Sequence, residues 1–137
     1  MKRASSITGR VLLACLFATP PSLSCGETLD EWHASKSEAV QLPPFCWGQM
    51  LDSQLADSKY WMNDCGPGVN HYCLGLLKIV RANKIFGEKW RRSAMLRGAK
   101  DNTIYTLEAI KNYPNCSIRS HAEQTLQLIE SQLKLFK

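Results

Sequence analysis

The segment that most restricts the fold is residues 63–84, NDCGPGVNHYCLGLLKIVRANK. Its Gly66-Pro67-Gly68 triplet does not continue a helix, because proline lacks the backbone donor and glycine loses much conformational freedom there. Beyond the triplet, apolar residues recur at the i, i+3, i+4 and i+7 positions of one helix face, at Cys73, Leu76, Leu77 and Val80. The pattern predicts a central helix from Val69 to about Asn83.

No segment shows the alternation typical of a strand, so we predict an all-α fold of about four helices in antiparallel hairpins. The other three helices are expected over residues 45–58, over residues 90–112 and from residue 117 onward. Together they form a single helical domain over residues 45–137. Residues 25–44 are polar and aperiodic and end in a proline pair, which predicts a polar leader that is flexible or lies along the surface.

The same spacing assigns the inward positions of the later helices. In the third helix they are Trp90, Ala94, Leu96, Ala99, Thr103, Leu107 and Ile110. In the last helix they are Ile118, Ala122, Ile129, Leu133 and Phe136. Ser120 and Glu123 have the spacing of a capping box at the start of that last helix.

The first 24 residues predict export. They carry three cations and no acid, and a short apolar run, VLLACLF, precedes Pro20-Pro21. This run is far below the roughly 20 apolar residues that span a bilayer. We therefore predict a signal peptide over residues 1–24 and a periplasmic or secreted product. Cys25-Gly26 also fits a bacterial lipidation site, so the alternative is a lipoprotein anchored to the outer membrane through Cys25.

Five cysteines follow the signal peptide: Cys25, Cys46, Cys65, Cys73 and Cys116. In an oxidising compartment cysteines usually form disulfides, and lipidation of Cys25 would leave four that pair in one of three ways. Cys65, His71 and Cys73 have donor atoms for zinc or copper. There is no C-x-x-C motif, however, and a fourth ligand is not near in sequence. We predict neither a metal nor a cofactor.

Two short motifs resemble those of a known group of proteins. LPPFC at residues 42–46 and NHYCLGLLKIVRA at residues 70–82 resemble the signatures of small exported, largely uncharacterised proteobacterial proteins with tetratricopeptide-like helical hairpins. The resemblance covers most of the chain after the signal peptide. It implies a disulfide between Cys46 and Cys73, since each motif contains one of them, and leaves Cys65 with Cys116 as the residual pair.

Positive charge is concentrated in residues 78–100, which hold eight cations and Glu88 as the single acid. We predict a binding surface formed by Arg81, Lys84, Arg91 and Arg92, with an envelope protein or an anionic envelope polymer as partner. The alternative is that these are ordinary solvated helix positions. An export signal argues against nucleic acid, and Phe86 and Trp90 have the spacing of core residues rather than of stacking platforms. The only expected route to a membrane is the lipid anchor.

These observations favour a periplasmic or envelope-associated helical binding or assembly module without catalytic activity. A groove between helical hairpins can hold a peptide or a partner helix. The alternative function is an envelope enzyme accessory or hydrolase that uses His71 with a nearby thiol or carboxylate. No G-x-S-x-G, H-E-x-x-H, P-loop or dinucleotide-binding motif is present, which makes an enzyme the less favoured prediction.

Overall fold

The computed structural model describes residues 31–50, 60 and 62–136, and within them every regular element is helical. The α-helices are α1 (Lys36–Ala39), α2 (Trp47–Met50), α3 (Val69–Asn83), α4 (Lys89–Ala109) and α5 (Arg119–Lys134). Three short 3-10 helices join them: η1 (Pro44–Cys46), η3 (Gly66–Gly68) and η4 (Ile110–Asn112). The predicted all-α class is confirmed.

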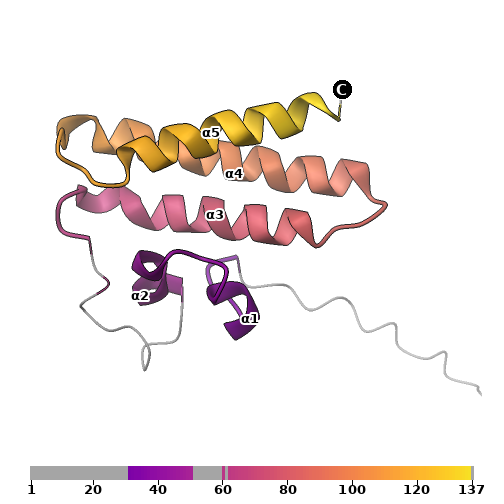
Figure 1. Ribbon diagram of the computed structural model, residues 1–137, viewed down its shortest axis with the longest axis horizontal. Coiled ribbons are helices and arrows are strands. Elements are labelled where there is room, and N and C mark those ends of the chain that lie inside the picture. Colours follow the sequence, from indigo (N-terminus) through magenta and orange to yellow (C-terminus); the bar gives the residue numbers. More distant parts are fainter. Residues whose placement is uncertain (1–30, 51–59, 61, 137) are drawn as a thin grey trace, which may run out of the picture.

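The three long helices form the body of the molecule (Figure 1). α3 and α4 run antiparallel and pack along their length, and α5 packs against α4. α1 and α2 lie on the side of α3 that faces away from α4. The predicted antiparallel hairpin is therefore present in α3 and α4, while the likeness to tetratricopeptide repeats stays a prediction. Among the described helices, none combines the length and the apolar character needed to cross a bilayer.

α3 has the boundaries that the sequence predicts. Tyr72, Cys73 and Leu77 on its inner face are fully buried. The long third helix confirms the predicted inward positions Leu96, Ala99 and Thr103 and departs from the prediction at its start. The buried positions of α4 are Ser93, Leu96, Ala99, Thr103 and Thr106, whereas Trp90 and Ala94 are exposed. The assignment of Trp90 and Ala94 to the core was wrong, because a stripe of small residues faces α3 instead.

The small residues of α4 allow α3 to approach closely. A Cβ built on Gly75 of α3 would lie 3.2 Å from the carbonyl oxygen of Ala99 and 3.3 Å from Oγ1 of Thr103. The buried threonine hydroxyls are satisfied by backbone carbonyls: Thr103 donates to Ala99 at 2.8 Å and Thr106 to Gly68 at 3.0 Å. Polar side chains can line this interface because none of these hydroxyls loses its hydrogen bond on burial.

We expect Gly75→Ala and Gly98→Ala to change stability in opposite directions. At Gly75 the new methyl group meets the backbone of a packed helix, and overpacking should lower the free energy of unfolding by about 1–2 kcal/mol. At Gly98 it meets only the flexible Lys78 side chain, so the higher helix propensity of alanine should raise stability by up to about 1 kcal/mol. Urea unfolding of both variants measures the difference. Equal effects of the two substitutions would contradict the close approach.

Part of the predicted leader is folded onto α3. Ser35 caps α1 in a capping box with Glu38, and Ala39 and Leu42 are buried. The Trp47 indole nitrogen donates to the carbonyls of Ala39 at 2.8 Å and Leu42 at 3.2 Å, which holds this arm against α2. The folded unit thus includes residues assigned to the leader by the sequence prediction.

Other expectations at this end fall outside what is described. The predicted helix over residues 45–58 begins as η1 and α2 and is seen as far as Met50. Residues 51–58 lie outside the described residues, as do the predicted signal peptide, Cys25 and the first residues of the leader.

Both predicted disulfides are present. Cys46 at the end of η1 is bonded to Cys73 in α3, and Cys65 before η3 is bonded to Cys116 before α5. The carboxylate of Asp64 accepts a hydrogen bond of 2.9 Å from the backbone nitrogen of Ser117, beside the second disulfide. The first bond therefore joins η1 to α3, and the second joins the segment before α3 to the segment after α4.

Candidate functional site

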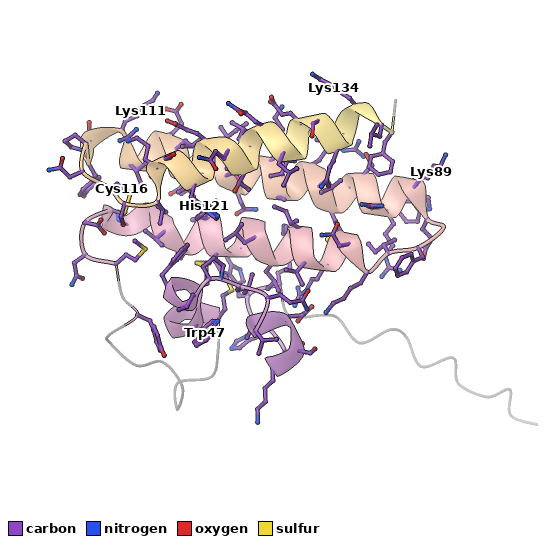
Figure 2. The ribbon with its side chains drawn as sticks, viewed as in Figure 1. Trp47, Lys89, Lys111, Cys116, His121 and Lys134 are labelled. Atoms are coloured by element: carbon purple, nitrogen blue, oxygen red, sulfur yellow. A yellow bond between two sulfur atoms is a disulfide. The ribbon has the colours of Figure 1, made fainter. Side chains whose placement is uncertain are left out.

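The predicted cationic surface lies at the turn between α3 and α4, residues 84–88. Gly87 has φ +79°, a left-handed conformation that favours glycine, and a Cβ there would meet nothing within 4 Å. The turn is at one end of the bundle, the end where α5 also finishes (Figure 1). Figure 2 shows Lys89 and Lys134 at this end and Lys111 and Cys116 at the opposite one. We call residues 84–91 the tip.

Arg81 does not project from the tip as predicted. Its side chain is 8% exposed and its Nε donates to Oε1 of Glu38 at 2.9 Å. One of its terminal nitrogens also donates to the carbonyl oxygen of His33 at 2.8 Å. Arg81 is thus a buried structural cation that holds the leader arm on α3, and its charge is matched by Glu38. The prediction was wrong because Glu38 lies 43 residues away in the sequence and no local pattern pairs it with Arg81.

The Glu38 carboxylate is fully engaged in this contact. Burial by itself raises its pKa, but the hydrogen bonds from Arg81 and from the backbone and hydroxyl of Ser35 outweigh burial and lower the pKa to about 2. Both oxygens are used, since Oε1 accepts from Arg81 and Oε2 accepts from the Ser35 nitrogen at 2.9 Å. Glu38 therefore remains charged at every pH near neutrality.

Arg92 also departs from the predicted cluster. It is partly buried, and its guanidinium carbon lies 5.6 Å from the centre of the Phe136 ring at the end of α5. This cation–π contact joins the first turn of α4 to the last residues of the chain described here. Arg92 therefore belongs to the α4–α5 interface, and it does not line the turn beside Lys84.

Lys84 and Arg91 remain together, as predicted. They line an open hollow of about 440 Å³ with Glu38, Arg81, Ile85, Phe86, Glu88 and Met95. Arg91 forms an ion pair of 3.4 Å with Glu88, and both side chains are about half exposed, so the pair contributes little to stability. Because Glu38 is matched by Arg81, Glu88 is the one acid left opposite Lys84 and Arg91 in this lining. The lining therefore has excess positive charge, and Ile85, Phe86 and Met95 give it an apolar part.

Two aromatic residues of the tip were misassigned from the sequence. Phe86 is 86% exposed and Trp90 is 72% exposed. Both were predicted as core residues by their spacing. Gly87 interrupts the helical register, and Trp90 then falls on the outer side of the first turn of α4. Gly87 was the signal in the sequence, because residues four apart lie on one face only when the helix between them is uninterrupted.

Among the described residues, the alternative site at His71 has no free thiol. Cys73 is bonded to Cys46, and the other two described cysteines are bonded to each other. The Nδ1 atom of His71 lies 3.1 Å from Oδ1 of Asn102, and its ring packs 4.1 Å from the ring centre of Tyr105. Cys73 is therefore not available to His71 as a thiol, and the alternative enzyme function stays a prediction.

The metal reading of Cys65, His71 and Cys73 is likewise lost, because both cysteines are in disulfides. Across residues 31–50, 60 and 62–136, no three or more His, Cys, Asp and Glu side chains are grouped as metal ligands would be.

His121 takes part in a polar network that the sequence did not indicate. It is exposed on α5, and its ring nitrogen is hydrogen-bonded to the hydroxyl of the buried Tyr72. Burial raises the pKa of Tyr72 to about 12, although a 2.8 Å hydrogen bond with Thr125 opposes the shift. The tyrosine stays neutral near pH 7, and its hydroxyl links α3 to α5.

Comparison of the chain with models of known protein families, with curated proteins and with solved structures gave no match.

Proposed function

We propose that the protein is an exported, envelope-associated helical binding or assembly module without catalytic activity, and that the tip is its binding surface. The partner is an envelope protein or an anionic envelope polymer. One observation supports this most directly. Lys84 and Arg91 line the same hollow, and Glu88 is the single acid of its lining that is not paired with a buried cation. A partner that supplies carboxylates or phosphates would relieve the repulsion between these cations.

Export is supported by the two disulfides, which are compatible with an oxidising compartment. All four described cysteines are in these two bonds. A periplasmic or secreted location follows as part of the same proposal.

The proposal is tested by reversing the charge of the tip. Lys84→Glu with Arg91→Glu should leave the melting temperature nearly unchanged, since both side chains are solvent-exposed. Recovery of partners by crosslinking from the native envelope should fall several-fold, and for the unmodified protein it should fall as salt is raised.

The matched control is Lys36→Glu with Lys111→Glu. It makes the same change in net charge, and Lys111 pairs with Glu108 three residues earlier just as Arg91 pairs with Glu88. Lys111 lies at the opposite end of the bundle from the tip (Figure 2). Loss of partners in both double variants would show a non-specific effect of charge. Equal recovery in the tip variant and the unmodified protein would refute the proposal.

A further inference from the structure

We infer that the tip docks on an anionic phospholipid bilayer, with Phe86 and Trp90 entering the headgroup region. The inference rests on the proposed function and assigns one occupant to the same surface. It differs from a lipid anchor, because it needs no modification of Cys25 and uses only side chains of the folded domain.

The aromatic side chains of the tip are exposed. Phe86 and Trp90 are 86% and 72% exposed, so each presents most of a large ring to water at one end of the molecule. Leu135, at the end of α5 beside the same end, is also among the exposed large hydrophobic residues. Aromatic rings of this kind are enriched where protein meets lipid headgroups, since one part of the surroundings is apolar and the other is wet.

The residues around the two rings carry mostly positive charge. Lys84, Lys89 and Arg91 flank Phe86 and Trp90, and Glu88 is the one acid among residues 84–91. Within the described part of the chain no ion pair is formed by Lys84 or Lys89, and Arg91 is paired only with the exposed Glu88. Apolar rings surrounded by cations complement a bilayer that combines an apolar interior with anionic headgroups.

The turn that carries Phe86 is short. The left-handed Gly87 reverses the chain within five residues, and the space around its Cα is open. Phe86 lies in this turn, at one end of the bundle (Figure 1), and its side chain is largely exposed although it contributes to the lining of the open hollow. A protein partner would have to supply a matching cavity for these rings, whereas a fluid lipid surface accommodates a projecting turn without one.

The test is flotation of the exported protein, carrying Cys25→Ser so that no lipid is attached, with two kinds of vesicle. We expect binding to vesicles of phosphatidylcholine with phosphatidylglycerol and little binding to phosphatidylcholine alone. Phe86→Ser with Trp90→Ser should weaken binding strongly. Lys84→Glu with Arg91→Glu should weaken it by about fivefold or more for each cation, and high salt should do the same. Val40→Ser is the control, because Val40 is an exposed apolar residue that follows α1 and does not line the hollow of the tip.

A second readout reports insertion directly. Lipids with brominated acyl chains should quench part of the tryptophan emission, and Trp90→Phe should remove most of that quenching while leaving flotation nearly intact. The chain has four tryptophans, so the difference between the two proteins isolates Trp90. Quenching that is unchanged by Trp90→Phe would overturn the inference, as would flotation that is unchanged in the Phe86→Ser, Trp90→Ser variant.

The outcomes also separate this inference from the proposed function. If the protein ignores both kinds of vesicle yet binds soluble polyphosphate or its envelope partner through Lys84 and Arg91, the bilayer inference fails and the proposed function stands. If binding to vesicles, to polyphosphate and to envelope partners is unchanged when Lys84 and Arg91 are reversed, both the bilayer inference and the proposed function fail.

Discussion

Arg81→Met should lower the free energy of unfolding by about 3–5 kcal/mol, the largest effect that we expect from one substitution. In the unmodified protein, Nε of Arg81 lies 2.9 Å from Oε1 of the buried Glu38 carboxylate. Methionine keeps much of the aliphatic stem of Arg81 but leaves this carboxylate without a counter-charge. The loss should appear in urea unfolding at pH 7. Lys100→Ala is the control, since its ion pair with Glu130 is partly exposed and should contribute less than about 1 kcal/mol. If Lys100→Ala lowered the free energy of unfolding as much as Arg81→Met, burial of the Arg81–Glu38 pair would not explain the effect.

The pH dependence of stability gives an independent check of the same contact. The pKa of Glu38 is lowered from 4.5 to about 2 on folding, so its contribution is fully present above pH 4.5. It is lost as the pH falls from 4.5 towards 2, and its size is about 3 kcal/mol. Glu38→Gln should remove this part of the pH dependence. Other carboxylates with lowered pKa values are unchanged in that variant, so the comparison isolates Glu38. An identical acid slope in both proteins would show that the pair is not coupled to folding.

Cys46→Ser and Cys73→Ser should each destabilise the protein by about 3 kcal/mol, and by similar amounts. They remove the same bond, which closes a loop between residues 27 positions apart and joins η1 to α3. Thermal unfolding followed by circular dichroism under non-reducing conditions measures the effect. The double variant Cys46→Ser, Cys73→Ser should resemble the single ones, because no further bond is lost. A double variant much less stable than either single variant would mean that the thiols stabilise the core in some other way.

The central hairpin could be predicted because its signal is local and dense. The apolar spacing of residues 69–83 lies in one uninterrupted helix with a helix-breaking triplet before it, so pattern and structure coincide at Val69 and Asn83. The pairing of Cys46 with Cys73 came from the resemblance of two motifs. The sequence alone left three pairings open.

The fate of the leader could not be predicted from local pattern. The Ser-x-x-Glu spacing of a capping box occurs at Ser24, Ser35 and Ser120, and we assigned the box to Ser120. The structure forms the box at Ser35, whereas α5 begins after Ile118 without a side-chain cap. The Glu38 carboxylate of this box accepts a hydrogen bond from Arg81, which lies 43 residues away in the sequence. Only the tertiary fold brings these two residues together.

The candidate site was predicted in part for a related reason. Lys84 and Arg91 are adjacent in space because a short turn joins their helices, which the sequence shows directly. Arg81 and Arg92 differ from them only in which face of the helix they occupy. Their partners, Glu38 and Phe136, come from opposite ends of the chain. Charge counting along the sequence therefore overestimated the free positive charge of the tip.

The order of the four bonded cysteines has a consequence for proteolysis. The bonds 46–73 and 65–116 overlap in sequence, so every peptide bond between residues 46 and 116 is spanned by at least one of them. A protease that cuts once anywhere in this interval produces two pieces that remain joined until a reductant is added. Two parts of the described fold lie outside the interval: the arm that carries Glu38 and helix α5. A cut before Cys46 or after Cys116 can therefore release one of these parts, while the α3–α4 hairpin stays within the interval that the two bonds cover.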